Sequence, residues 1–212
     1  MKLFSSLLFL CTFSLYAQEG LHIIQKPILF TQKRVALTLE YMQKHYGITQ
    51  KDIRIKPQMI VVHATATKTL EDAFNRFNPE MLLSDRKDIA SASALNVSAH
   101  FLVARDGKVY QLMPENFMAR HVIGLNYYAI GIENVGGRYG QEDLTQAQLK
   151  ANVMLITYLE KKYSTLKYVI GHYEYREYEN SPLWLEKDAN YRTSKVDPGK
   201  IFMRELRERL KN

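Results

Sequence analysis

Apolar and polar positions alternate along the chain in patterns that predict its helices and strands. Between Gln32 and Tyr46, apolar side chains recur at positions 35, 39, 42 and 46, so they share one helix face, and Gly47 ends the helix. The run from Met59 to His63 is apolar until its last residue, as in a buried strand. These patterns predict an amphipathic helix followed by an interior strand.

The next segment contains a start signal for a helix and a turn signal for a hairpin. Thr69 and the three residues after it have the form of a capping box, which predicts a short helix. Asp106-Gly107 separates two strand-like runs, 99–104 and 108–112. An Asp-Gly pair between such runs is typical of a tight β-hairpin.

The second half of the chain continues the alternation of strands and helices. Residues 129–133 and 168–172 read as strands, and Thr145 begins the longest helix, with apolar positions 149, 153, 156 and 159. Roughly 25 irregular residues then precede a last helix, a length that favours a functional loop over a simple connection. The pattern predicts an α/β fold: a single domain with a mixed central β-sheet flanked by helices.

The first seventeen residues have a different character. Lys2 precedes an apolar stretch that reaches Ala17 without an acidic residue, which is typical of a secretory signal peptide cleaved after Ala17. The stretch is shorter than the about 20 residues that span a bilayer. We therefore expect an exported protein, periplasmic or secreted, with no transmembrane segment after cleavage. The expected division is a signal peptide at 1–17, an N-terminal helical extension at 18–57 that packs on the domain, and the domain itself at 58–212.

Cysteine usage limits the chemistry that the mature chain can carry. Cys11 is the only cysteine, and it lies in the predicted signal peptide. The mature chain therefore has no disulfide, no thiol nucleophile and no cysteine-ligated zinc or iron–sulfur cluster. Any metal site must use nitrogen and oxygen ligands.

The charge of the chain indicates a class of partner. The formal net charge is +7, and loss of Lys2 leaves 28 basic against 22 acidic residues, or +6. For an exported protein, the acidic counterpart is an envelope polymer or a membrane surface. No motif sets aromatic residues among clustered basic ones, so we expect no nucleic-acid partner.

Two histidines and one aspartate form the candidate site. His63 and His172 each close an apolar, strand-like run, and Asp197 follows downstream in Lys195-Val-Asp-Pro-Gly199. Two imidazoles and a carboxylate can hold a catalytic metal and leave a fourth position open for water. On this pattern alone, hydrogen-bonded structural histidines remain the alternative. We expect His100 to be a packed structural histidine.

Two further histidines of the mature chain, His22 and His45, have no supporting pattern. We expect both to be surface residues.

Five blocks, in this order, resemble the zinc-dependent N-acetylmuramoyl-L-alanine amidases over residues 58–202. The blocks are Ile60–Ala66, Ser98–Val103 with Arg105–Gln111, Ala119–His121 with Asn126, Ile130–Glu133, and Gly171-His172 with Lys195–Gly199. The resemblance implies the fold of peptidoglycan recognition proteins. It also implies cleavage of the amide between N-acetylmuramic acid and L-alanine in peptidoglycan or muropeptides.

Carried over position by position, the resemblance also implies roles for individual residues. The implied Zn²⁺ ligands are His63, His172 and Asp197. Glu133 corresponds to the acidic catalytic residue of the family and Lys195 to the basic one. Substrate-binding positions fall at His121 and Asn126. The aromatic residue that commonly precedes this histidine in relatives is replaced by Arg120.

The residue types suit amide hydrolysis. A carboxylate at Glu133 can take a proton from water and pass it to the departing nitrogen. Lys195 lies two residues before Asp197 in an extended segment and can stabilise an oxyanion.

Two other functions are alternatives to this one. A non-catalytic peptidoglycan-binding module of the same fold typically lacks a metal ligand, and this chain keeps all three. A different zinc hydrolase fits less well, because the cysteines of a deaminase and the His-Glu-x-x-His helix of a metalloprotease are absent.

Overall fold

A six-stranded mixed sheet organises the part of the chain that the structure describes. The computed structural model describes residues 20–211, and the predicted signal peptide at 1–17 lies outside them. The strands are β1 (Ile23–Gln25), β2 (Met59–Ala64), β3 (Phe101–Val103), β4 (Val109–Gln111), β5 (Ala129–Asn134) and β6 (Tyr168–Gly171). Their spatial order is β1-β4-β3-β5-β2-β6. Only β3 and β4 pair antiparallel among these strands, which makes the sheet mixed, as predicted.

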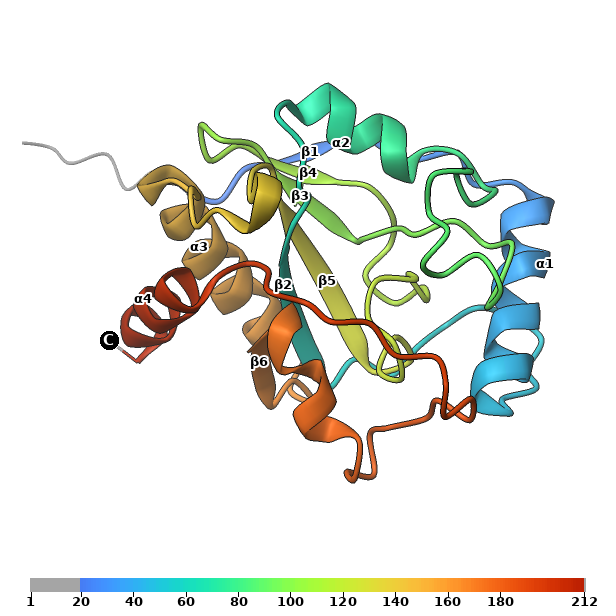
Figure 1. Ribbon diagram of the computed structural model, residues 1–212. Coiled ribbons are helices and arrows are strands. Elements are labelled where there is room, and N and C mark those ends of the chain that lie inside the picture. The colour runs from blue at the N-terminus through green and yellow to red at the C-terminus, as the bar shows by residue number, and fades with distance from the viewer. Residues whose placement is uncertain (1–19, 212) are drawn as a thin grey trace, which may run out of the picture.

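Helices cover both faces of the sheet. In Figure 1, α3 (Gln146–Lys162) and α4 (Lys200–Leu210) lie on one side of it, and α1 (Gln32–Tyr41) lies on the other. Strand β2 packs against the helices on both faces, because successive side chains of a strand point to opposite faces of the sheet. Ile60 and Val62 join the core cluster of α3 and α4, whereas Met59 and Val61 join the cluster that contains Tyr41.

The helix signals in the sequence are confirmed. Helix α1 continues into a π-helical turn, η1 (Met42–Tyr46), and Gly47 ends it with a left-handed φ of 67°. The side chain of Thr69 accepts a hydrogen bond from the backbone at the start of α2 (Leu70–Phe77). Thr145 forms a complete capping box at the start of α3.

The predicted hairpin also forms, since β3 and β4 pair antiparallel across Asp106-Gly107. Two short 3-10 helices complete the fold: η2 (Arg138–Gly140) and η3 (His172–Tyr178). The second of them begins the long segment that the sequence predicts to be irregular. The remainder of that segment, in red tones in Figure 1, runs from the end of η3 across the molecule to α4.

The prediction for one histidine was wrong. His22 is exposed, as expected, but His45 is only 2 % exposed. Its Nδ1 lies 2.8 Å from Oε1 of Glu186, and its Nε2 lies 3.1 Å from the carbonyl oxygen of Ala92. The partner carboxylate is 141 residues away in sequence, so no local pattern could show it.

Among residues 20–211, no helix combines the length and the apolar character that crossing a membrane requires.

Candidate active site

Three neighbouring parallel strands bring the candidate residues to one edge of the sheet. Strands β5, β2 and β6 lie side by side, so their carboxyl ends meet. His63 is the next-to-last residue of β2, and its direct partner on β5 is Glu133. His172 follows the last residue of β6. The ends of such strands are where open α/β sheets place their ligands.

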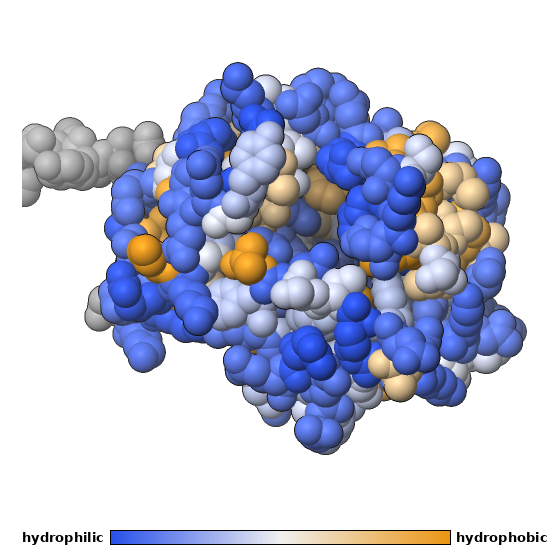
Figure 2. Space-filling model, viewed as in Figure 1, coloured by the Kyte–Doolittle hydropathy of each residue, from blue (hydrophilic) through white to orange (hydrophobic). Residues whose placement is uncertain are grey.

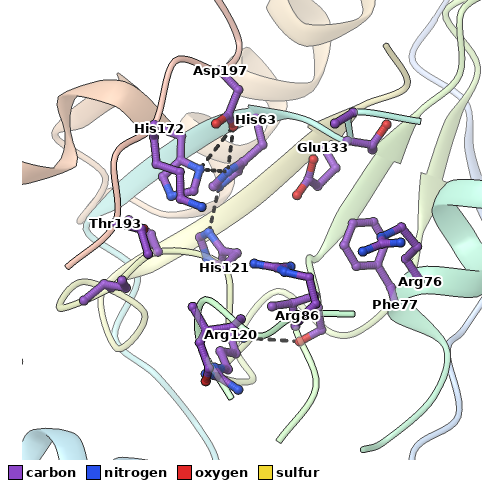
Figure 3. A pocket seen from close by; sticks show the side chains of 18 of the residues that line it. His63, Arg76, Phe77, Arg86, Arg120, His121, Glu133, His172, Thr193 and Asp197 are labelled. Atoms are coloured by element: carbon purple, nitrogen blue, oxygen red, sulfur yellow. Dashed lines mark hydrogen bonds and ion pairs between the residues drawn. The ribbon is translucent and has the colours of Figure 1, made fainter. Parts of the chain in front are cut away.

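The imidazoles of His63 and His172 and the carboxylate of Asp197 converge on one point (Figure 3). The Nδ1 atoms of the two histidines are 3.0 Å apart. Oδ2 of Asp197 lies 3.1 Å from Nδ1 of His172 and 3.5 Å from Nδ1 of His63. This cluster is the group of potential metal ligands found among the described residues.

These separations fit a metal ion. Around a tetrahedral zinc with bonds of about 2.0–2.1 Å, the ligand atoms lie about 3.3 Å from one another. Nitrogen and oxygen are also the donors that zinc accepts in a cysteine-free site. The three side chains therefore have the spacing and the chemistry of a zinc site.

A chain of hydrogen bonds fixes which nitrogen of His63 is free. The carbonyl of Ala129 can only accept, so Nε2 of His121, at 3.3 Å, donates to it. Nδ1 of a neutral His121 is then an acceptor, and Nε2 of His63 donates to it across 2.9 Å. The lone pair of His63 Nδ1 is consequently free and faces His172 and Asp197, as a metal ligand requires.

The protonation of the cluster agrees with that arrangement. Burial, together with the nearby charge of His172, lowers the pKa of His63 from 6.5 to about 4. Burial and the charge of His63 likewise hold the pKa of His121 well below 6.5. For Asp197, burial opposes ionisation, but the charge and hydrogen bond of His172 outweigh it and hold its pKa well below 3.8. Near neutral pH the imidazoles of His63 and His121 are therefore neutral, and the carboxylate of Asp197 is charged.

Glu133 is the unpaired acid of the site. Its side chain is buried, and Oε2 has no hydrogen-bond partner among the described residues. Burial raises its pKa from 4.5 to about 8, the charge of Asp197 adds to that effect, and Lys195 and Arg86 oppose it. Lys195 lines the same cavity. The two predicted catalytic residues are thus brought together beside the metal-ligand cluster.

His121 and Asn126, the predicted substrate-binding residues, line the cavity but are also bound within the protein. Oδ1 of Asn126 accepts from the backbone N–H groups of His121 and Val122 at 2.9 and 2.8 Å. Its Nδ2 donates to the hydroxyl of Tyr46 at 2.7 Å. Asn126 therefore holds the backbone that carries His121, and contact of either residue with substrate stays a prediction.

The site opens into a cavity of about 450 Å³. Figure 2 shows the corresponding hollow, bordered largely by hydrophilic residues. Arg76, Phe77 and Arg86 form the wall that faces the histidines in Figure 3. The sequence pattern did not assign these three residues to the site. Arg76 and Phe77 read as part of the short helix α2, and the loop that carries Arg86 has no periodic signal.

Arg120 organises the same wall from inside the protein. Its guanidinium is buried and donates to the carbonyl oxygens of Ile89, Ser93 and Leu95, with distances of 3.0 Å to Ile89 and 3.1 Å to Ser93. It also donates to the hydroxyl of Tyr191 at 3.0 Å. Arg120 thus occupies the position of the usual aromatic residue and ties together two segments that line the cavity.

Several solved structures are similar to this chain. An endolysin N-acetylmuramoyl-L-alanine amidase, LysCS from Clostridium intestinale, is 22% identical, with 76% of this chain and 86% of that chain covered and a TM-score of 0.48. AmiD from E. coli, in complex with anhydro-N-acetylmuramic acid-L-Ala-D-gamma-Glu-L-Lys, is 19% identical, with 76% and 60% covered and a TM-score of 0.49. Human PGRP-IBETAC is 19% identical, with 69% and 80% covered and a TM-score of 0.47.

No curated protein matches the chain. The sequence profile described as N-acetylmuramoyl-L-alanine amidase, however, matches residues 53–200, which is more than half of the chain. That match includes every residue of the cavity named above, from His63 to Asp197. The chain therefore belongs to the N-acetylmuramoyl-L-alanine amidase family.

Proposed function

We propose that this protein is a zinc-dependent hydrolase of the amide between N-acetylmuramic acid and L-alanine in peptidoglycan or muropeptides. The observation that carries the proposal is the convergence of His63 Nδ1, His172 Nδ1 and Asp197 Oδ2 beside the unpaired carboxyl of Glu133. Membership of the N-acetylmuramoyl-L-alanine amidase family indicates which amide bond is cut. Because the chain keeps all three ligand positions, an enzyme is favoured over a module that only binds peptidoglycan.

His63, His172 and Asp197 would hold the zinc ion, and the cavity beside them would receive the substrate. A zinc ion bound there supplies Lewis acidity, which polarises a carbonyl and makes a water acidic, with a pKa of about 7. The protein residues around it must then orient the amide and move protons.

Glu133 fits the proton-transfer role. A general acid or base works best when its pKa lies near the working pH, and that of Glu133 is raised to about 8. Its Oε2 accepts no hydrogen bond from the described residues, so its lone pairs are available to take up a proton. We assign Glu133 the transfer of a proton from the attacking water to the departing nitrogen.

Lys195 fits the electrostatic role. It lines the cavity, and its positive charge acts on both Glu133 and His63. A fixed cation beside the reacting carbonyl stabilises the negative charge that develops on oxygen. We therefore assign Lys195 the role of stabilising this oxyanion.

The test is mass spectrometry of a defined muropeptide, N-acetylmuramic acid joined to L-Ala-D-Glu and a diamino acid, incubated with purified residues 18–212. We expect release of a peptide that begins at L-alanine, loss of that activity with a chelator, and recovery when zinc is restored. Binding without cleavage, by zinc-loaded protein and with whole peptidoglycan also tested, would instead assign a recognition module. Activity that survives thorough chelation would contradict the zinc requirement.

We also propose that the protein acts outside the cytoplasm, in the periplasm or after secretion. The support is the sequence pattern of residues 1–17, which has a basic start, an apolar middle and a small residue at Ala17. Expression from Met1 in a bacterial host followed by N-terminal sequencing tests this. An exported product that begins at Gln18 is expected, and an intact cytoplasmic chain would contradict the proposal.

A further inference from the structure

His121 touches the candidate metal site from the side opposite Asp197. In Figure 3, the ring of His121 lies below His63, and a dashed line joins the two. The rings meet edge to face, with centroids 5.0 Å apart. The hydrogen bond joins Nδ1 of His121 to Nε2 of His63, whereas the metal-facing nitrogen of His63 is Nδ1. His121 therefore contacts the back of a predicted ligand.

The protein holds the ring of His121 in place by three separate means. Its Nε2 donates to the carbonyl of Ala129, and its backbone N–H donates to the side chain of Asn126. Gly131 on β5 makes room for it: a Cβ atom at that position would lie 2.9 Å from both Cγ and Nδ1 of the His121 ring. Such a contact is shorter than real Cβ atoms show. The ring of His121 can therefore occupy this position only because residue 131 has no side chain.

We propose that His121 is a positioning residue for the metal ligand His63. Its Nδ1 accepts a hydrogen bond from Nε2–H of His63, and it thereby keeps Nδ1 of His63 unprotonated and aimed at His172 and Asp197. This inference rests on the proposed metal site. It gives His121 a role toward the metal that is distinct from the substrate contact predicted from the sequence.

The physical reason lies in the two neutral forms of imidazole. If the acceptor at position 121 is removed, the buried Nε2–H of His63 has no partner, which costs about 1–3 kcal/mol. The other form, with the proton on Nδ1, then becomes favourable, because that proton can be donated to Oδ2 of Asp197 at 3.5 Å. A protonated Nδ1 cannot bind a metal. Loss of such outer partners typically weakens metal binding 10–100-fold.

Two substitutions at one position separate hydrogen bonding from packing. His121→Asn places an amide oxygen near the position of Nδ1 and keeps an acceptor for His63, whereas His121→Leu removes it. Zinc affinity is measured by competition with a chromophoric chelator near pH 7.5. We expect about 10–100-fold weaker binding for His121→Leu and recovery of most of that loss for His121→Asn. His45→Gln, which alters a buried histidine bonded to Glu186 and Ala92 and not to His63 or His121, is the matched control and should bind zinc as the unaltered protein does.

Gly131→Ala provides a second route that leaves every histidine in place. The added methyl must displace the ring of His121 from the position in which it bonds to His63, so zinc binding should weaken here too. In the metal-free protein, long-range proton–nitrogen NMR correlations should show the proton of His63 on Nε2.

The outcomes are distinct. If the unaltered protein binds no zinc, the proposed function fails. If it binds zinc, and folded His121→Leu and Gly131→Ala bind it equally tightly, only the role of His121 is refuted. A proton on Nδ1 of His63 in the metal-free protein would also overturn that role, even if His121→Leu does not fold.

Discussion

His63 and Glu133 occupy directly paired positions on the adjacent parallel strands β2 and β5. Both side chains are buried, yet one is bonded within the ligand cluster and the other keeps a carboxyl oxygen without a partner. An unpaired buried carboxyl is costly to keep, so a folded protein that retains one has a use for it. The pairing places that carboxyl one strand away from the ligand cluster.

Replacement of Glu133 by Gln tests its catalytic role without changing the size of the side chain. We expect turnover of a muropeptide to fall by about 10²–10⁴-fold, the usual contribution of a general acid or base. Zinc affinity should be kept, because Glu133 is not in the ligand cluster. Turnover within a few-fold of normal in the zinc-loaded variant would remove Glu133 from the proton-transfer role.

Acid should destabilise the fold partly through His100. This buried histidine donates from Nε2 to the carbonyl of Phe117 and accepts at Nδ1 from the N–H of Gly131, so only its neutral form fits. Burial lowers its pKa from 6.5 to about 4, against the opposing effects of the Phe117 carbonyl and the charge of Glu115. The ring edge of His121 also faces it.

The direction in which stability changes with pH follows from the lowered pKa of His100. Between pH 6.5 and about 4, the unfolded chain takes up a proton at His100 and the folded protein does not, so stability falls as the pH falls. The share of His100 is roughly 3 kcal/mol once the pH is below about 4. Urea unfolding at several pH values should give a shallower acid slope for His100→Gln. An identical slope in the variant would contradict the assignment.

Arg120 should be among the more important polar residues for stability. Replacement by Met leaves the carbonyl groups of Ile89, Ser93 and Leu95 without their donor, and we expect a loss of about 3 kcal/mol or more in the free energy of unfolding. The control is Arg86→Met, which removes a partly exposed cation paired with Asp88 and should cost less than about 1 kcal/mol. Equal losses for the two variants would show that the hydrogen bonds of Arg120 contribute no more to the free energy of unfolding than a surface ion pair does.

The buried pair of His45 and Glu186 should show strong coupling. Each side chain is at most 2 % exposed, so loss of either leaves a polar group buried without its partner. We expect about 3–5 kcal/mol for His45→Ala or Glu186→Ala alone. The double variant should cost at least about 1 kcal/mol less than the sum of the two, measured by urea unfolding. Simple additivity would argue against a direct interaction.

Local signals in the sequence predicted the elements of this fold well. Capping residues such as Thr145, the terminator Gly47 and the hairpin signal at Asp106-Gly107 act within a few residues, so they can be read directly. Strand β1 was not predicted, because it is three residues long and only partly buried, which leaves no clear pattern.

The candidate site was predicted by family blocks more than by periodicity. His63 and His172 end apolar runs, and this marked them as unusual, but only the fold shows that they lie 3.0 Å apart. The roles of Arg120 and His45, and the contact of His121 with His63, depend on residues 25 to 141 positions apart. Other contacts of His121, with Asn126, Ala129 and Gly131, are within ten residues. The long-range contacts leave no trace in local spacing.

The way Arg120 holds the cavity wall has a consequence for how this protein can diverge. Its guanidinium binds backbone carbonyls, which every amino acid possesses, so the anchoring does not depend on the identity of the side chains that it fixes. Exposed positions of the loop that Arg120 binds, such as Ser91 and Ala94, are free to change while the loop keeps its path. Selection can therefore alter the surface of this loop without altering the histidines and aspartate across the cavity.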